Sequence, residues 1–332
     1  MGNQKLSAVI IFTCTLFWMS CSNDPKGNNP KDTGTVKTTP RVKAPAFNSD
    51  SAYAFIQKQV DFGPRVPGTP EHAACASWMT QKLKSYGLDV SVQNAPVTFY
   101  DGRKATLSNI FGQFHKERER RVLLLAHWDT RPRADRDSVR QSEPIPGAND
   151  GGSGVGVLLE IARVIAQNDP GIGVDILLVD GEDNGDPGGE AETWCLGSQY
   201  WAQNRPQGYK ADFAILLDMV GAKDAIFPRE GTSVYFASGI VEKVWSAAAN
   251  LGYGNYFVNN IVGQTTDDHL FINMYARIPA IDIVHYDPKR MDYGHFHHRH
   301  TDSMEYIDKG TLGAVGHVVL DVLFNEQPTP AP

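Results

Sequence analysis

Cysteine and clustered basic residues are both scarce in this chain of 332 residues. It holds only 4 cysteines, and none are spaced as the CxxC pair of a zinc knuckle, so a cysteine-built metal site is not expected. The formal net charge is −7, and no run of lysine and arginine is long enough to follow a phosphate backbone. We therefore expect no nucleic-acid partner.

Long hydrophobic runs are missing beyond the N-terminus. There, Lys5 is followed by LSAVIIFTCTLFWMS and then Cys21. This run is too short for a comfortable membrane span and is typical of a secretory signal peptide over 1–20. Ser20 before Cys21 resembles a bacterial lipoprotein box, although Met19 is not its favoured residue; the alternative is an ordinary signal peptide. The lipoprotein interpretation implies a lipid anchor at Cys21 and a periplasmic or cell-surface location.

The rest of the chain divides simply. Segment 21–46 is polar, rich in proline and glycine and without periodicity, which predicts a flexible, lipidated tether. We find no internal repeat and no second linker, so we expect one folded domain over 47–326 and a short tail, 327–332. This domain contains Cys75 and Cys195. A disulfide between them and two isolated buried thiols are equally compatible with the sequence.

Apolar periodicity predicts alternating helices and strands. Helices are expected at 50–63, at 69–87, and at 239–252, and another follows Gly151, with Ser153 as its cap. Short, nearly continuous apolar runs predict strands buried on both faces, at 121–130, 173–182, 212–221 and 278–287. This alternation predicts an α/β fold with three layers, α/β/α, around a mixed, mostly parallel sheet.

Ligand-type side chains follow three of these strands and one turn. They are His127 and Asp129, Glu182 and Asp183, Asp218, and Asp150 in the turn GANDGGSG. In such sheets, ligands bind outside the carboxyl ends of the strands, so we expect these groups to converge. A solvated acidic loop would explain VDGEDNG at 179–185 alone. Four segments that each deliver such groups favour a common site instead.

Carboxylates and imidazoles that converge out of water need a cation or shared protons to offset their repulsion. Oxygen and nitrogen ligands without a thiolate suit catalytic zinc. The cluster DYGHFHHRHTDS at 292–303 supplies further imidazoles, only some of which can bind one ion. The sequence therefore predicts a zinc site with nearby acid–base groups.

Six fragments carry a resemblance to a known family: AHWDT, GANDGGSG, VDGED, LLDMVGA, TTDDHLF and HHRHTDS. They occur in the order found in zinc-dependent aminopeptidases of the M28 type. More narrowly, the chain resembles the animal-type (type II) glutaminyl-peptide cyclotransferases, over 50–325. The resemblance implies a zinc aminopeptidase-like fold, with 47–326 as a zinc-dependent catalytic domain. It also implies conversion of the N-terminal glutamine of peptides and proteins to pyroglutamate, with release of ammonia.

The resemblance further implies that one zinc ion is bound by Asp150, Asp183 and a late histidine. In the family's histidine motif an acidic residue lies four positions beyond the ligand. Asp302 lies four positions beyond His298, so His298 is the expected ligand, with His297 as the alternative.

Acid–base and substrate roles are also implied by the resemblance. Glu182 falls in the position of the general base, and Asp218 and Asp267 in an acidic hydrogen-bond network. Trp194 falls in the wall of the substrate pocket; without the resemblance it would be an exposed loop aromatic. The loop at 184–193 is a lid, a pocket wall or a solvated insertion.

His127 and Asp129 match an HxD motif that contributes to a second metal site in dinuclear aminopeptidases. A zinc aminopeptidase that hydrolyses N-terminal residues is therefore the alternative function, and a second zinc is compatible with the sequence. The chain departs from the animal cyclases at three positions. Asp183 replaces a glutamate, His297 replaces a tryptophan, and Ala126 replaces a disulfide-forming cysteine.

Overall fold

The computed structural model describes residues 41–326, which belong to one compact unit. The predicted signal peptide, Cys21, the start of the tether and the tail lie outside these residues. Val42, within the segment expected as the tether, exchanges two hydrogen bonds with Asn325, at 2.8 and 3.0 Å. None of the helices between 41 and 326 combines the length and apolar character needed to span a membrane.

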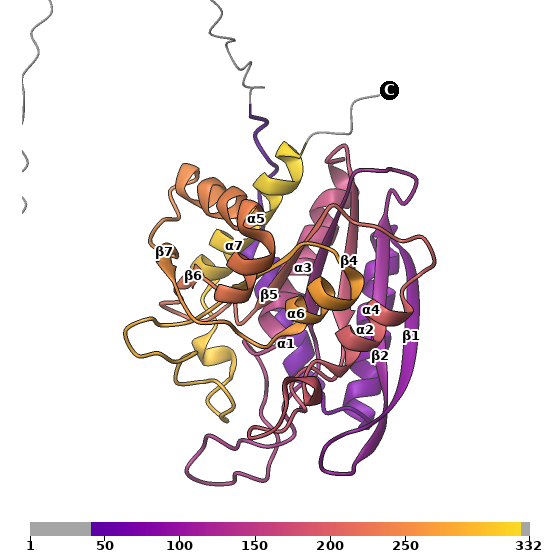
Figure 1. The fold of residues 1–332 in the computed structure, drawn as a ribbon, viewed down its shortest axis with the longest axis vertical. Helices are drawn as coiled ribbons and strands as arrows, with labels where there is room; N and C mark the ends of the chain where they lie inside the picture. Colours follow the sequence, from indigo (N-terminus) through magenta and orange to yellow (C-terminus); the bar gives the residue numbers. More distant parts are fainter. Residues whose placement is uncertain (1–40, 327–332) are drawn as a thin grey trace, which may run out of the picture. The chain divides into compact units, whose positions relative to one another are not determined.

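A six-stranded sheet in the order β1-β2-β4-β3-β5-β8 forms the centre of this unit (Figure 1). Its strands are Asp89–Thr98 (β1), Lys104–Phe114 (β2), Arg121–His127 (β3), Gly173–Val179 (β4), Phe213–Asp218 (β5) and Ala280–Val284 (β8). The four strands expected from apolar runs, β3, β4, β5 and β8, are parallel neighbours. β1 and β2 are antiparallel additions at one edge. The predicted mixed, mostly parallel sheet is confirmed.

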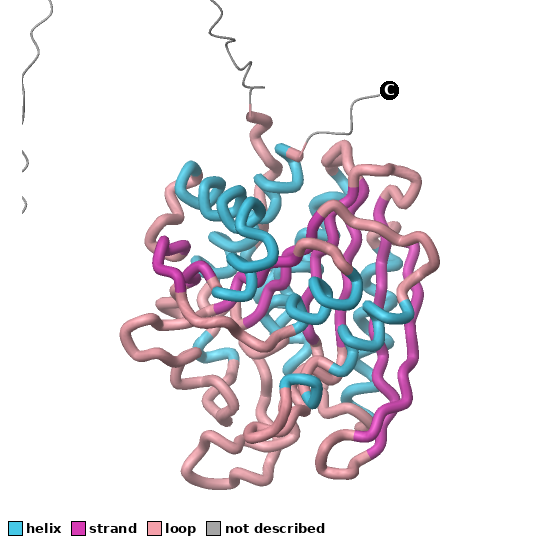
Figure 2. The backbone as a smooth tube through the Cα atoms, viewed as in Figure 1, coloured by secondary structure: helices cyan, strands magenta, loops and turns pink. Residues whose placement is uncertain are grey.

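Helices cover both faces of the sheet (Figure 2). They are Ser49–Asp61 (α1), Pro70–Ser85 (α2), Gly152–Gln167 (α3), Leu196–Asn204 (α4), Gly231–Asn250 (α5), Asp268–Phe271 (α6) and Lys309–Asn325 (α7). Leu124 of β3 points into the core that contains α1, α2, α3, α5 and α7. Its neighbours Leu123 and Leu125 point to the opposite core, with Trp201 of α4. Because alternate residues fill opposite cores, these strands must be apolar throughout.

Smaller elements complete the described chain. β6 (Phe227–Arg229) and β7 (Phe257–Ile261) form a separate parallel pair. Single helical turns occupy Ala191–Thr193, Ile272–Ala276 and Met304–Tyr306. The first of these lies in the loop between β4 and α4, close to the predicted site.

Two helices start differently from expectation. Ser153 lies inside α3 and does not cap it; its hydroxyl donates to the Asn149 carbonyl at 2.6 Å and accepts from the Val220 amide at 2.9 Å. The reason is that Gly151 turns the chain sharply enough for the helix to begin at Gly152. The helix predicted at 239–252 is the second part of α5, after a break where the backbone of Ala237 is non-helical. An additional first part begins at Gly231, because the Glu230 carboxylate caps it by accepting two backbone N–H groups.

Close packing of α1 on α3 predicts a stability effect at Gly156. A Cβ at this position would lie 2.5 Å from Cγ1 of Ile56 and 2.9 Å from the Ala52 carbonyl. We expect Gly156→Ala to lower the free energy of unfolding by about 1–3 kcal/mol, measured by urea denaturation. Gly239→Ala is the matched control, because a Cβ there meets nothing within 4 Å. It should leave stability unchanged or raise it by up to about 1 kcal/mol; equal losses in both variants would contradict this interpretation.

Candidate metal centre and active site

Two buried carboxylates fix the turns that bear the predicted ligands. Asp302 accepts the backbone N–H groups of Asn149 and Asp150, at 2.7 and 3.0 Å. Asp129 accepts those of Glu182 and Asp183, at 3.1 and 3.2 Å. Asp129 and Asp302 are both fully buried. Each therefore acts as a clamp on the backbone of a turn whose own carboxylates face the site.

Asp129 was expected to belong with His127 in an HxD motif. Its oxygens are already occupied by the backbone of 182–183 and by the Asn184 amide, at 3.0 Å, so it shapes the turn that follows β4. His127 behaves differently. Its Nε2 lies 3.2 Å from Oδ1 of Asp150 and 3.1 Å from Oδ1 of Asp218. The two residues of the HxD motif therefore have different roles: His127 lies in the site, and Asp129 supports the turn behind it.

Gly151 brings Asp150 against His127. Its φ of +79° is left-handed, and a Cβ would lie 2.8 Å from Cε1 of His127. Burial alone would lower the pKa of His127, but hydrogen bonds from its ring to Asp129, Asp150 and Asp218 raise it well above the usual value. The glycine is required here because any side chain would separate the imidazole from the turn.

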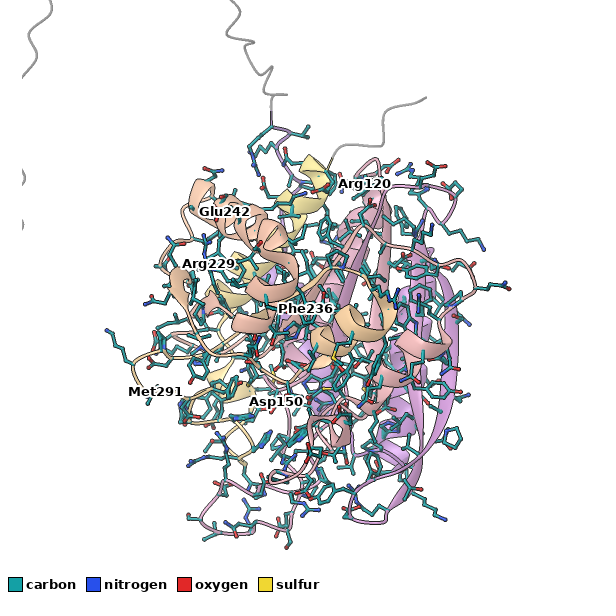
Figure 3. The ribbon with its side chains drawn as sticks, viewed as in Figure 1. Arg120, Asp150, Arg229, Phe236, Glu242 and Met291 are labelled. Carbon is teal, nitrogen blue, oxygen red and sulfur yellow. The ribbon has the colours of Figure 1, made fainter. Side chains whose placement is uncertain are left out.

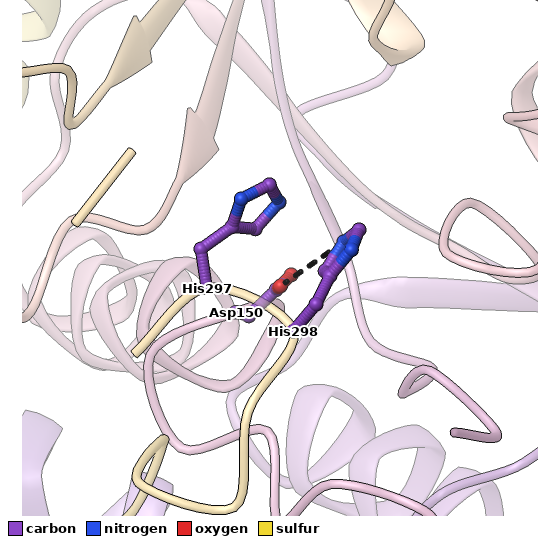
Figure 4. Close-up of side chains that lie close together, drawn as sticks. All are labelled: Asp150, His297 and His298. Atoms are coloured by element: carbon purple, nitrogen blue, oxygen red, sulfur yellow. Dashed lines mark ion pairs between the residues drawn. The ribbon is translucent and has the colours of Figure 1, made fainter. Parts of the chain in front are cut away.

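His298 lies between the two acidic turns. Its Nε2 is 3.1 Å from Oδ1 of Asp183 and 3.9 Å from Oδ2 of Asp150, while its Nδ1 is 3.5 Å from Oδ1 of Asp135. A carboxylate on one ring nitrogen of a histidine commonly orients the other toward a metal. Figure 4 shows His298 beside Asp150, with His297 nearby; all three offer ligand atoms within 4.8 Å of one another. The contacts of both nitrogens favour His298 over His297.

Unpartnered oxygens show that this arrangement suits a cation. Oδ2 of Asp150 and Oδ2 of Asp183 are buried, and neither accepts a hydrogen bond from any residue between 41 and 326. Leaving buried carboxylate oxygens without a donor costs several kcal/mol or more, so native proteins pair such groups or place them on metals. The donors are oxygen and imidazole nitrogen, the combination found in catalytic zinc sites. By donor type, Asp150, Asp183 and His298 therefore fit a zinc ion. The buried Nδ1 of His297 also lacks a partner among residues 41–326, and His297 shares the 4.8 Å group with Asp150 and His298, so it stays the alternative ligand.

A second possible ligand set shares Asp150. His127, Asp150 and Asp218 offer ligand atoms that lie within 4.8 Å of one another, and all three are buried. The described residues thus provide donors for one metal ion beside His298 and for another beside His127. The expected single zinc and the alternative pair both have residues to hold them.

Arg131 is a site residue that sequence reasoning missed. Its guanidinium is buried, donates to the Asp183 carboxylate at 3.2 Å and pairs with Asp135. It also lies 4.9 Å from the ring of Trp194, at cation–π distance. No local pattern marks it, because arginine is common in polar loops such as TRPRADR. Its position is apparent only once the loop after β3 is folded over the loop after β4.

Trp194 is held at the surface of the site. Its Nε1 donates to the Asp186 carbonyl at 3.1 Å. The indole is nearly parallel to the His298 ring, with an interplanar angle of 12° and centroids 6.2 Å apart. The contacts with Asp186, Arg131 and His298 make Trp194 part of the site wall instead of a freely exposed aromatic.

A cavity of about 530 Å³ opens onto these groups. Its lining includes six of the predicted site residues: Asp150, Glu182, Trp194, Asp218, Asp267 and His298. The remaining one, Asp183, is buried and contacts the lining through His298. Tyr293 and Arg136 also line the cavity. In Figure 3, Asp150 lies below α6, in the lower half of the view.

Two acids of this cavity have a raised pKa. Burial and the charge of Asp218 raise the pKa of Asp267 to about 7, although His269 and His127 act in the opposite direction. Burial also raises the pKa of Glu182 well above its usual value, with Asp267 and Asp183 contributing. Carboxyl groups with raised proton affinity are suited to acid–base catalysis.

Both cysteines of the described chain are free, buried thiols. The alternative of a disulfide between Cys75 and Cys195 is therefore wrong. Cys75 is a residue of α2 that packs into the core, whereas Cys195 follows Trp194 directly. Only Cys195 lies beside the cavity residues, 3.4 Å from Oε1 of Glu182.

Residues 109–323 match the model of peptidase family M28. The chain belongs to this family. Similar folds occur in the crystal structures of glutaminyl cyclases from Bacteroides thetaiotaomicron, bound to N-acetylhistamine (49% identity, TM-score 0.84), and from Tannerella forsythia (50% identity, TM-score 0.83). They cover 86% and 85% of this chain, respectively, and 100% of theirs. A Zn-dependent exopeptidase from Parabacteroides distasonis is equally similar, at 49% identity and TM-score 0.83, over 85% of this chain and 100% of its own.

The curated relatives of this M28 chain are longer proteins. Three probable zinc metalloproteases are 26% identical to it, and the chain spans only 35–39% of their lengths. The similarity therefore covers one part of those proteins, and it agrees with the zinc-binding donor set found here.

The position of Trp194 depends on Gly185. A Cβ on Gly185 would lie 2.1 Å from Cδ2 of the indole, too close for any packing. We expect Gly185→Ala to displace the indole from Arg131 and His298 while the zinc content stays unchanged. The displacement is measured in a crystal structure of the variant and by near-ultraviolet circular dichroism. Gly188→Ala, where a Cβ meets nothing within 4 Å, should leave both signals unchanged; an unmoved indole in Gly185→Ala would contradict the prediction.

Proposed function

We infer that this protein is a zinc-dependent glutaminyl cyclase. It converts the N-terminal glutamine of peptides and proteins to pyroglutamate and releases ammonia. The observation that carries the inference is the cavity in which Glu182 and Trp194 face the ligand set of Asp150 and His298. The 49–50% identity to bacterial glutaminyl cyclases over most of the chain supports the same activity.

Asp150, Asp183 and His298 would hold the zinc ion. When bound, zinc supplies Lewis-acid polarisation of the γ-carbonyl of the substrate glutamine. Arg131 and Asp135 keep this ligand set in place, because Arg131 pairs with Asp183 and Asp135 faces Nδ1 of His298. The residues around the ligands thus set their direction before any substrate arrives.

Glu182 is placed to move the proton of the reaction. Its carboxylate lies in the cavity wall, and its raised pKa makes it a stronger base than an exposed glutamate. It accepts a proton from the substrate α-amine and returns it to the departing amide nitrogen, which leaves as ammonia. Asp218 and Asp267 line the same cavity. The charge of Asp267 contributes to the raised pKa of Glu182, and that of Asp218 to the raised pKa of Asp267.

Trp194 forms the wall against which the glutamine side chain folds. Cyclisation joins the α-amine to the γ-carbonyl of one residue, so the enzyme gains most by holding the bent conformation. A rigid indole, fixed by Asp186 on its nitrogen and by Arg131 on one face, provides that surface. Because the reacting residue is the N-terminal glutamine, it enters the cavity first, and the residue that follows it lies toward the cavity mouth.

We also propose that the protein is a lipoprotein, with the lipid anchor at Cys21 and a periplasmic or cell-surface location. The support is the sequence alone: a short apolar run, a small residue before Cys21 and a polar tether.

A zinc aminopeptidase is the second candidate, and one observation favours it. The ligand set of His127, Asp150 and Asp218 gives the site enough donors for two metal ions. In that case Glu182 would activate a water molecule for attack on the peptide bond. The two candidates use the same base and differ in the atom that attacks.

Glu182→Gln should separate catalysis from metal binding. The substitution keeps the size of the side chain but removes its ability to accept a proton, so we expect turnover to fall at least about 100-fold. Zinc content, measured by atomic absorption, should match the wild type. Glu192→Gln is the control, because Glu192 is exposed and lies outside the cavity lining. Near-normal turnover of the Glu182→Gln enzyme would show that Glu182 is not the general base.

The two candidate functions predict different products. Incubation with a glutamine-initiated peptide should release ammonia and shift the peptide mass by loss of ammonia, without cleavage. A chelator should stop the reaction, and added zinc should restore it, with a metal-to-protein ratio close to one. Release of free glutamine with a ratio close to two would instead establish the aminopeptidase.

A further inference from the structure

Cys195 holds Glu182 in two ways. Its backbone N–H donates to the carbonyl of Glu182 at 3.1 Å, and its thiol lies 3.4 Å from Oε1 of the same residue. The second distance is within the range of a hydrogen bond from sulfur. The main chain and the side chain of one residue therefore fix both ends of Glu182.

The backbone at Cys195 is unusual. Its φ of +54° is left-handed, a conformation that few residues other than glycine adopt. The residue stands directly before α4, and the following amide, of Leu196, donates to the carbonyl of Gly181 at 3.1 Å. Because of this backbone geometry, the Cys195 side chain points toward Glu182, while the preceding residue, Trp194, forms part of the cavity wall.

The surroundings keep this sulfur a hydrogen-bond donor. Cys195 is fully buried, and Glu182, Asp267 and Cys195 offer atoms within 4.8 Å of one another. A thiol among carboxylates has no reason to ionise, and burial raises its pKa well above the usual value. The proton on sulfur is therefore available to Oε1 of Glu182.

We propose that the thiol of Cys195 is a positioning group for the catalytic base: its S–H donates to Oε1 of Glu182 and fixes the carboxylate in the direction of the substrate amine. This inference rests on the proposed function of Glu182.

Kinetics of Cys195→Ala and Cys195→Ser test the proposal in the full-length protein. Both variants face the same left-handed backbone, so strain does not distinguish them. We expect Cys195→Ala to lower kcat about tenfold with KM unchanged, because the base is present but no longer oriented. Cys195→Ser, which retains a donor, should recover kcat to within about threefold of the wild type.

Cys75→Ala is the matched control, since it removes the other buried thiol at a distance from the cavity lining. It should keep the wild-type kcat even if it lowers the melting temperature. A Cys195→Ala enzyme with wild-type kcat, or a Cys195→Ser enzyme as slow as Cys195→Ala, would overturn the proposal.

An infrared measurement tests the hydrogen bond without activity. The difference between the spectra of the wild type and Cys195→Ala isolates the S–H band of Cys195. In the Glu182→Gln background this band should move to higher wavenumber, because an amide oxygen accepts more weakly than a carboxylate. An unmoved band contradicts the proposal. Wild-type protein that fails to cyclise glutamine peptides refutes the proposed function separately, and the same variants are then compared on N-terminal hydrolysis, which also uses Glu182.

Discussion

The site depends on two carboxylates that never face the substrate. Asp129 and Asp302 each accept two backbone N–H groups from the turns that carry Glu182 with Asp183 and Asp150. These hydrogen bonds fix the backbone of each turn and so determine where the carboxylates of Asp150, Glu182 and Asp183 lie. Burial, together with the charge of Asp150, raises the pKa of Asp302 to about 8. The clamps therefore set the direction of the site acids but do not remove the repulsion between them.

Arg131 then supplies positive charge to the acidic site that the two clamps have shaped. Arg131 is fixed by Asp135 and Asp183, and its guanidinium lies over Trp194. One buried arginine thus links a metal-ligand candidate to the wall of the cavity. Because Arg131 pairs with only one oxygen of Asp183, the other remains available for a metal ion. The arginine and the ion divide the negative charge between them, so neither has to neutralise the whole site.

The sequence predicted those parts of the molecule that local chemistry determines. β3, β4, β5 and β8 are buried on both faces, so their continuous apolar runs were visible, and the polar residues after β3, β4 and β5 marked the rim. β1 escaped because it is largely exposed and has no such run. Arg131 and the clamp role of Asp129 also escaped, because both depend on how one loop folds over another. Whether Cys75 and Cys195 form a disulfide could not be predicted for the same reason, because it depends on the distance between them in the fold.

The aspartate at 183, where animal cyclases have glutamate, has a structural counterpart in His298. The Nε2 atom of His298 lies 3.1 Å from Oδ1 of Asp183, and its Nδ1 lies 3.5 Å from Oδ1 of Asp135. His298 has a φ of +57°, a strained conformation that costs of order 1 kcal/mol or more in a residue other than glycine. The contacts on both ring nitrogens offset this strain, so the acids that orient the imidazole also stabilise the backbone conformation that brings it to the site.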